Sequence, residues 1–309
     1  MAEFGSVGVV GGGLIGMSWT SLFLARNCKV IVVDPDPAAR DRLTDFVHTA
    51  WPNLAALGLT EGREIPTPTV TPDFDALAGV DFIQENGPER IEVKRSIIAA
   101  IESVVGADAV IASSTSSLTA TDMQVDARHP GRILVAHPMN PPHLVPMVEL
   151  VSGQHTTEAT RVIAERFYAQ MQRVTIRVKR EVPGHLANRL TSALYREAVH
   201  LVAEGIADVE DIDKAIAYGP GMRWAFMGPH LTYHLGGGEA GYRGYLDRLG
   251  PTQEARWRTL GTPQLSEDLK TELVAGVERE LASQDKATLT ERRDAALVAL
   301  MKLKASFGL

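Results

Sequence analysis

Two residues near the middle of the chain, His137 and Glu149, are polar side chains in apolar surroundings. His137 follows the run Ile133–Ala136, and Glu149 lies inside the run Val145–Val151, with a proline-rich loop between the runs. A buried carboxylate is costly to leave unpaired. If the runs are neighbouring strands, Glu149 can orient the imidazole of His137 and stabilise its protonated form, which predicts a general base near neutral pH. The alternative is a buried core histidine and an ordinary glutamate at a sheet edge.

A second polar cluster, SSTSSLTATDM, follows the apolar run Ala109–Ala112. Serines and threonines before a helix usually cap its N-terminus, and part of the cluster serves that purpose. Its position also matters, because ligands of open α/β sheets bind at the C-terminal ends of parallel strands. The cluster therefore predicts polar groups at a ligand site.

The N-terminal stretch has the pattern strand, glycine turn, helix, strand. The run Val7–Val10 is followed by GGGLIG, a helix-like segment Met17–Arg26 and a second run, Val30–Val33. This order predicts a dinucleotide-binding turn, in which the amides and the dipole of the helix N-terminus attract the phosphates.

Each glycine of this turn has a predicted task. Gly11 permits the tight turn, Gly13 lets a pyrophosphate approach the backbone, and Gly16 lets the helix pack on the strand. Leu14 and Ile15, between the last two of these glycines, are further predicted cofactor contacts.

Asp34, at the end of the second run, predicts which dinucleotide binds. An acid here hydrogen-bonds the adenosine ribose hydroxyls. Asp34 is followed by Pro35 and Asp36, which place negative charge where a 2′-phosphate would lie. The sequence therefore predicts NAD rather than NADP as the cofactor.

Length and composition narrow the class of protein. With 309 residues, 45% of them hydrophobic, the chain is expected to fold into two domains. It has no run of about 20 apolar residues and no basic N-terminal segment leading into a hydrophobic signal, so a soluble, cytoplasmic protein is expected. One cysteine, Cys28, excludes a cysteine-based metal cage, and a formal net charge of −7 without basic blocks argues against nucleic-acid or membrane partners.

Strand-like and helix-like segments alternate from Val7 to about Val178, which predicts an α/β fold with a doubly wound, Rossmann-type sheet. Pro183–Gly184 marks a boundary, after which helical periodicity replaces strand-like runs. We therefore expect an NAD-binding domain over 1–181 and an all-helical domain over 182–309. Further helices are predicted at the segments Val209–Ala217, Leu265–Ser283 and Thr288–Lys304.

Taken together, the motifs resemble the 3-hydroxyacyl-CoA dehydrogenase family nearly end to end. GGGLIG, ENGPER with IEVK, SSTSSL, AHPMNPPHLVPMVELV and VPGHLANRL occur in that family's order and close to its spacing. The resemblance implies that Ser116 contacts the substrate oxygen, that His137 is the acid/base with Glu149 as its partner, and that Asn188 orients His137 or the substrate. It also implies that Glu89 and Lys94 reach the NAD, and that the protein is a homodimer formed through its C-terminal domain.

The resemblance implies hydride transfer from C3 of the substrate to NAD while His137 removes the 3-hydroxyl proton. Two segments depart from the acyl-CoA enzymes, however. Pro35–Gly79 carries three arginines against seven acids, which makes a poor site for the phosphates of CoA. In YGPGMRWAFMG, Arg223 beside Trp224 suggests a carboxylate anchor on an aromatic wall, although a surface ion pair is the alternative for Arg223.

GMRWAFMGP and the segment after it resemble the branch that holds L-carnitine dehydrogenase and L-gulonate 3-dehydrogenase, the latter including lambda-crystallin. The leading hypothesis is therefore an oxidoreductase acting on a small 3-hydroxy carboxylate, L-carnitine-like first and L-gulonate-like second. The runner-up acts on an acyl-CoA such as 3-hydroxybutyryl-CoA, and the non-enzymatic alternative is a crystallin-like structural protein. His230 and His234 stand four residues apart, but without a third ligand nearby no metal site is predicted.

Overall fold

The structure is a computed structural model that describes residues 4–282 and 284–309. The predictions that concern the first three residues and Ser283 lie outside the described residues. The chain groups into two units, one ending at Arg189 and including Asp294–Met301, the other made of Leu190–Arg293 and Lys302–Leu309. The domain boundary between residues 181 and 182 stays a prediction.

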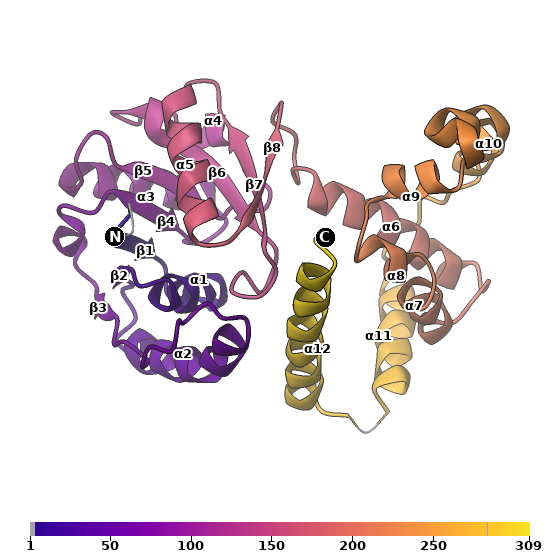
Figure 1. Ribbon diagram of the computed structural model, residues 1–309, viewed down its shortest axis with the longest axis horizontal. Coiled ribbons are helices and arrows are strands. Elements are labelled where there is room, and N and C mark those ends of the chain that lie inside the picture. Colours follow the sequence, from indigo (N-terminus) through magenta and orange to yellow (C-terminus); the bar gives the residue numbers. More distant parts are fainter. Residues whose placement is uncertain (1–3, 283) are drawn as a thin grey trace. The chain divides into compact units, whose positions relative to one another are not determined.

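One sheet organises the first unit, as the Rossmann-type fold class predicts (Figure 1). Among the described residues its strand order is β3-β2-β1-β4-β5-β6-β7-β8, and neighbours are parallel except for the antiparallel pair β6–β7. The strands are β1 Ser6–Val10, β2 Lys29–Val33, β3 Thr69–Thr71, β4 Phe82–Glu85, β5 Val110–Ser113, β6 Ile133–Pro138, β7 Met147–Ser152 and β8 Val174–Val178.

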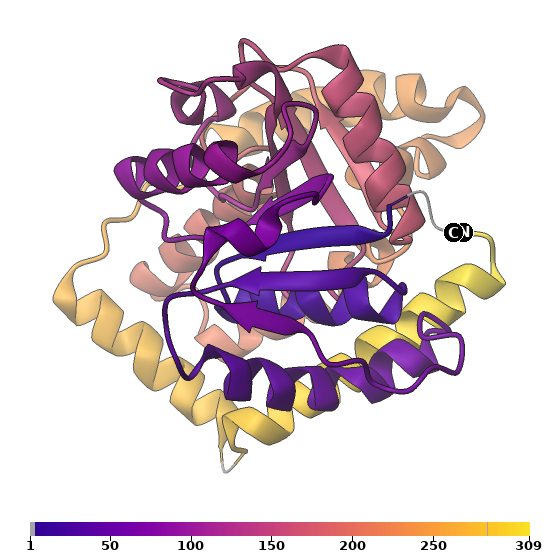
Figure 2. The ribbon, with the colours of Figure 1, turned by 90° about the vertical axis from the view of Figure 1, so that its left-hand side faces the viewer.

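Helices cover both faces of this sheet, which is why most of its strand residues are apolar (Figure 2). On one face, Trp19 and Phe23 of α1 pack with Phe167 of α5, whose ring stacks on Phe82 of β4. On the other face, Ile98 of α3 packs with residues of η1 and α4. The helical elements of this unit are α1 Leu14–Ala25, α2 Ala39–Ala56, η1 Phe74–Leu77, α3 Ile91–Val104, α4 Ala120–Met123, η2 Pro130–Arg132 and α5 Glu158–Gln170.

The alternation of side chains along β6 and β7 decides where their polar residues lie. Ile133 and Val135 of β6 belong to the core on the α3 side, and His137 continues the same alternation. Val151 of β7 shares that core, so Glu149 lies on the same side. The pleat of the two strands therefore places both polar side chains on one face of the sheet.

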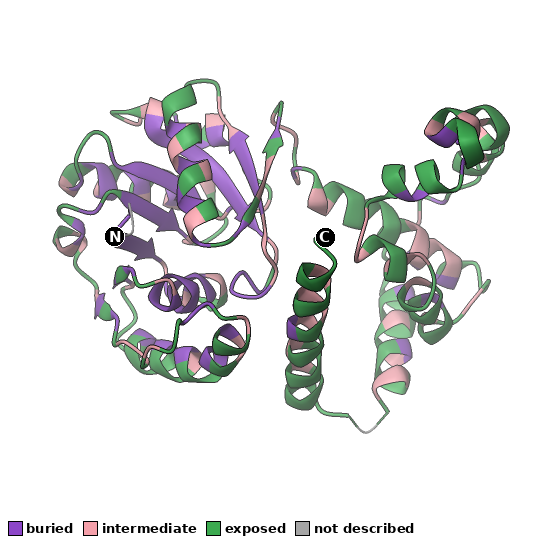
Figure 3. Ribbon diagram, in the orientation of Figure 1, coloured by how far each residue is buried: buried purple, intermediate pink, exposed green. Residues whose placement is uncertain are grey.

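The second unit is helical, and no strand follows Val178 among the described residues. Its buried core is small and consists of Val199, Val202, Ile212 and Leu269. Figure 3 shows that most strand residues of the first unit are buried, whereas most residues in the helices of the second unit are exposed. The helical elements from the end of the first unit onward are α6 Ala187–Ala203, α7 Val209–Ala217, α8 Pro220–Trp224, α9 Pro229–Leu235, η3 Gly238–Ala240, α10 Gly241–Trp257, α11 Glu267–Leu281 and α12 Lys286–Ser306.

Most element predictions agree with the structure, and α7 has the predicted bounds. Between α2 and β4 the chain forms the edge strand β3 and the short helix η1, and the sequence predicts neither of these two elements. The first helix starts at Leu14, three residues before the predicted Met17, so Leu14, Ile15 and Gly16 of the glycine motif lie in its first turn. None of the described helices has the length and apolar character needed to cross a membrane.

Candidate active site

His137 and Glu149 are directly opposed residues in the β6–β7 pair. Nδ1 of His137 lies 2.7 Å from Oε2 of Glu149, and both side chains are buried. Oε1 of Glu149 accepts hydrogen bonds from the amides of Leu186 and Ala187, at 2.8 and 2.9 Å. Both carboxylate oxygens are therefore paired inside the protein.

This pairing decides the charge of Glu149. Burial alone would raise the pKa of Glu149, but the hydrogen bonds from His137, Ala187 and Leu186 outweigh it and leave the pKa below its usual value. The carboxylate is therefore ionised at neutral pH and accepts a hydrogen bond from the N–H at Nδ1 of His137. Nε2 of the neutral imidazole then keeps a lone pair, as a general base requires.

The loop after β5 carries Ser116, and Glu89 holds this loop from the ENGPER turn. Oε1 of Glu89 accepts from the amides of Ser116 and Ser117, both at 2.9 Å, and from the hydroxyl of Thr115 at 2.6 Å. Burial raises the pKa of Glu89, but the hydrogen bonds from Thr115 and Ser117 and the charge of Lys94 bring it below its usual value. An ionised Glu89 therefore fixes the backbone of the serine loop.

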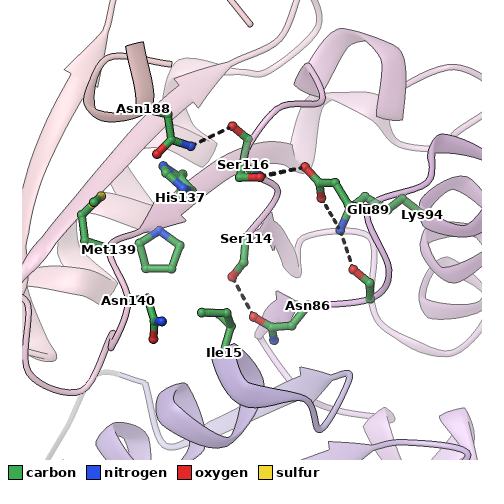
Figure 4. A pocket seen from close by; sticks show the side chains of 12 residues that line it. Ile15, Asn86, Glu89, Lys94, Ser114, Ser116, His137, Met139, Asn140 and Asn188 are labelled. Carbon is green, nitrogen blue, oxygen red and sulfur yellow. Dashed lines mark hydrogen bonds and ion pairs between the residues drawn. The ribbon is translucent and has the colours of Figure 1, made fainter. Parts of the chain in front are cut away.

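Asn188, in the first turn of α6, reaches the same loop from the opposite side. Its Nδ2 donates to the carbonyl of Ser116 at 3.3 Å. Ser116, His137 and Asn188 all line one cavity of about 380 Å³ (Figure 4). The remaining lining residues are Ile15, Asn86, Gly87, Glu89, Lys94, Ser114, Pro138, Met139 and Asn140. The structure thus brings together the four predicted catalytic residues, with Glu149 behind His137.

Lys94, a predicted cofactor contact, forms a buried ion pair and a backbone hydrogen bond inside the protein. Its Nζ lies 2.8 Å from Oε2 of Glu85 and 3.1 Å from the carbonyl of Gly87, with only 1% of the side chain exposed. Glu89 is 3.8 Å away. The ion pair with Glu85 was not predicted, although an acid at the end of an apolar strand is the same signal that singled out Asp34. The pair anchors the ENGPER turn against β4.

The glycine turn fits a bound dinucleotide. Gly11 has φ +96°, which favours glycine, and a Cβ on Gly16 would lie 1.9 Å from the carbonyl oxygen of Gly11, so no side chain fits there. The Cβ position of Gly13 has open space around it, which leaves the backbone accessible. Leu14 begins α1, and its N-terminus presents free amides to an anion.

Asp34 lies where the ribose is predicted to bind. Its Oδ2 accepts from the amide of Gly12 at 2.6 Å and its Oδ1 from the amide of Asp36 at 2.8 Å. A cavity of about 610 Å³ begins here and is lined by Gly11, Gly13 and Asp34 among others. Since Asn86 and Gly87 line both this cavity and the one with His137, the two cavities share a wall. The donor set and the open backbone at Gly13 are those expected for NAD.

The predicted carboxylate anchor lies in the second unit. Arg223 and Trp224 form the end of α8, and both side chains are exposed, Trp224 to 40%. Their role in substrate binding stays a prediction. In α9, His230 and His234 instead interact with Tyr242, through its hydroxyl and its amide respectively. The described residues hold no group of three or more potential metal-ligating side chains.

Two family models match the chain. The 3-hydroxyacyl-CoA dehydrogenase NAD-binding domain matches residues 6–182, and the C-terminal domain of the same family matches residues 184–270. Among curated relatives, the L-carnitine dehydrogenase of Streptomyces coelicolor is 43% identical, covering 98% of this chain and 95% of the relative. That of Oceanobacillus iheyensis is 40% identical, covering 96% and 97%.

Solved structures agree with this assignment. An NAD⁺-dependent dismutase, 5-formyl-3-hydroxy-2-methylpyridine 4-carboxylic acid 5-dehydrogenase, has a TM-score of 0.83 at 26% identity, covering 98% of this chain and 99% of that one. FadB2 of M. tuberculosis has a TM-score of 0.67 at 27% identity, covering 88% and 94%. The chain belongs to the 3-hydroxyacyl-CoA dehydrogenase family and is an NAD-dependent dehydrogenase of CH–OH groups.

Proposed function

We propose that the protein oxidises the C3 hydroxyl of a small, free 3-hydroxy carboxylate, with L-carnitine as the first candidate. The observation that carries this proposal is the group of curated relatives named L-carnitine dehydrogenase, which are 37–44% identical over nearly the whole chain. The cavity with His137, Ser116 and Asn188 supports it, because it gathers the groups needed to hold and deprotonate a secondary alcohol.

In this proposal His137 is the acid/base. Its Nε2 removes the 3-hydroxyl proton, and the ionised Glu149 stabilises the imidazolium that results. As the substrate oxygen becomes a carbonyl oxygen, it accepts hydrogen bonds from the second N–H of Asn188 Nδ2 and from the hydroxyl of Ser116, which turns to it from Glu89. Bound NAD supplies the hydride acceptor for the C3 hydrogen. In the reverse direction the protonated His137 returns its proton to the alcohol oxygen.

The choice of a free carboxylate over a CoA thioester rests on charge. Pro35–Gly79 has an excess of acids, so it repels the phosphates of CoA. Arg223 at the end of α8 offers a planar guanidinium of the kind that binds a carboxylate by two hydrogen bonds. A guanidinium in this role binds the carboxylate of a free acid, and a thioester has no carboxylate there for it to bind.

A substrate panel tests the proposed function. Turnover of L-carnitine, L-gulonate, 3-hydroxybutyrate and 3-hydroxybutyryl-CoA with NAD is compared by NADH absorbance, for the wild type, for Arg223→Ala and for the exposed control Arg243→Ala. We expect L-carnitine to be preferred and Arg223→Ala to raise its KM by about 10- to 100-fold. A preference for the thioester, or an unchanged KM in Arg223→Ala, would contradict the assignment.

We also propose that the protein forms a homodimer through its helical domain. Large apolar side chains stay exposed there, including Leu190 at 69%, Tyr195 at 60% and Tyr218 at 80%. The family resemblance points the same way. Sedimentation equilibrium should give twice the chain mass for the wild type, and Tyr195→Asp should lower the association constant. A monomeric wild type would contradict this proposal.

A further inference from the structure

His185 is a buried histidine for which the mechanism above has no use. Only 1% of it is exposed, and it follows Gly184 in a turn where both residues have positive φ, +77° and +50°. Histidine is among the residues that adopt this conformation more readily than most. The turn directs the imidazole toward the serine loop, where Nε2 lies 3.2 Å from the carbonyl oxygen of Thr115.

The four residues that start with His185 connect the two halves of the candidate active site. The amides of Leu186 and Ala187 hold Glu149, the partner of His137. His185 and Asn188, on either side of them, contact the carbonyls of Thr115 and Ser116 respectively, which are successive carbonyls of the serine loop. One short segment therefore fixes both the loop that presents Ser116 and the carboxylate that orients His137.

The contact with Thr115 settles the tautomer of His185. A carbonyl oxygen only accepts, so Nε2 of His185 must carry the hydrogen, and Nδ1 keeps a lone pair. Among the described residues Nδ1 has no hydrogen-bond partner, so a second proton placed there would be a buried, unpaired donor. The tautomer that the structure favours is thus neutral and donates at Nε2.

Some of the charged groups around His185 raise its pKa, and others lower it. The ring of His137 lies 5.3 Å from its ring, centroid to centroid, and a protonated His137 opposes a second positive charge. The carboxylates of Glu149 and Glu89 favour the protonated form of His185, and the carbonyl of Thr115 does too. Burial is the largest effect and holds the pKa of His185 below its usual value. His185 therefore stays neutral while His137 exchanges its proton.

We propose that His185 is a positioning residue for the dehydrogenase reaction: its neutral imidazole fixes the Thr115 carbonyl and thereby the placement of Ser116 relative to His137. The inference rests on the proposed function, because the placement of Ser116 matters only if Ser116 holds the substrate oxygen. It concerns hydride transfer in the bound complex, so it predicts an effect on kcat rather than on NAD binding.

Three substitutions of His185 test separately the effects of its hydrogen-bond donor, its aromatic ring and its positive φ. His185→Gln can place an amide N–H near the position of Nε2. His185→Phe keeps a buried ring but has no donor, and His185→Asn tolerates positive φ but is too short to reach the carbonyl. His48→Gln, an exposed histidine on α2, is the control.

Steady-state kinetics with L-carnitine and NAD give the first readout. We expect His185→Phe and His185→Asn to lose about 10- to 100-fold in kcat, with NAD affinity unchanged, and His185→Gln to recover most of the loss. A His185→Phe enzyme with wild-type kcat would overturn the inference. So would a His185→Gln enzyme as slow as His185→Phe, because the donor would then be irrelevant.

A second readout does not need turnover. Two-bond proton–nitrogen correlation spectra of histidine-labelled enzyme report the tautomer of each imidazole, and the His185 signal is identified by its loss in His185→Gln. We expect a neutral, Nε2-protonated His185 from pH 6 to 8. A cationic or Nδ1-protonated His185 would overturn the inference, even if the protein turned over none of the 3-hydroxy acids and the proposed function failed.

Discussion

His137 and Glu149 face each other across an antiparallel strand pair, and a 2.7 Å hydrogen bond joins their side chains. The second oxygen of Glu149 accepts hydrogen bonds from the amides of Leu186 and Ala187, where α6 begins. The carboxylate therefore has two tasks: it accepts a hydrogen bond from the N–H at Nδ1 of His137, and it anchors the start of α6. Each task demands acceptors only, which explains why an ionised carboxylate occupies this position.

Glu149→Gln tests the first task. If the introduced amide keeps its oxygen toward Leu186 and Ala187, its NH₂ group faces Nδ1 of His137 and donates to it. The imidazole proton then moves to Nε2, and the base loses its lone pair toward the substrate. We expect kcat to fall by about 10³- to 10⁴-fold, measured by NADH formation, with the thermal midpoint little changed. Glu158→Gln, at the exposed start of α5, is the control, and a loss of less than tenfold in Glu149→Gln would argue against the tautomer argument.

Ser116 and Ser117 form a matched pair, since Glu89 accepts from the amide and the hydroxyl of both. Only Ser116 lines the cavity with His137. We expect Ser116→Ala to lower kcat/KM by about 10- to 100-fold, as the loss of a hydrogen bond to a developing charge does, and Ser117→Ala to lower it much less. Equal losses in the two variants would mean that the serines only hold the loop.

Asp34 should set the preference between the two dinucleotides. Replacing it by serine removes the acceptor for the ribose hydroxyls and the charge that repels a 2′-phosphate. We expect the ratio of kcat/KM for NAD over NADP to fall by about 10- to 100-fold in Asp34→Ser. Asp45→Ser, exposed on α2, should leave the ratio unchanged. A wild-type ratio in Asp34→Ser would show that another residue selects NAD.

Glu89 should make the stability of the first unit depend on pH. Its pKa in the folded protein is below the usual value of 4.5, so the ionised form stabilises the fold above pH 4.5. That contribution disappears as the pH falls through the lower folded pKa. We therefore expect the gap in unfolding free energy between wild type and Glu89→Gln to be full near pH 6 and to narrow below pH 4.5. Urea titrations of both proteins measure this gap, and a gap that grows on acidification would contradict the assignment of charge.

Much of the sheet could be predicted from the sequence, because its strands are short apolar runs and its glycine turn has fixed spacing. β3 could not, since three residues between prolines carry no periodicity. The helices α8, α9 and α10 were also missed, because glycines and prolines interrupt their apolar pattern.

In the candidate site, too, some residues could be predicted from the sequence and others could not. His137 and Glu149 could be paired from two neighbouring runs, since each is conspicuous in an apolar segment. His185 and Glu85 were missed, because the partners of each, Thr115 and Lys94, are fixed by tertiary packing rather than by spacing. The sequence around a single polar residue does not predict which carbonyl or ammonium group that residue binds in the folded protein.

In the proposed reaction, His137 exchanges the proton of a 3-hydroxyl group while NAD is reduced. The most direct measurement compares the single-turnover rate of NADH formation from L-carnitine in the wild type and in His137→Gln, with NAD affinity measured alongside. We expect ready turnover by the wild type and a loss of at least about 10³-fold in His137→Gln, with NAD binding preserved. A His137→Gln enzyme that reduces NAD within tenfold of the wild-type rate would contradict it.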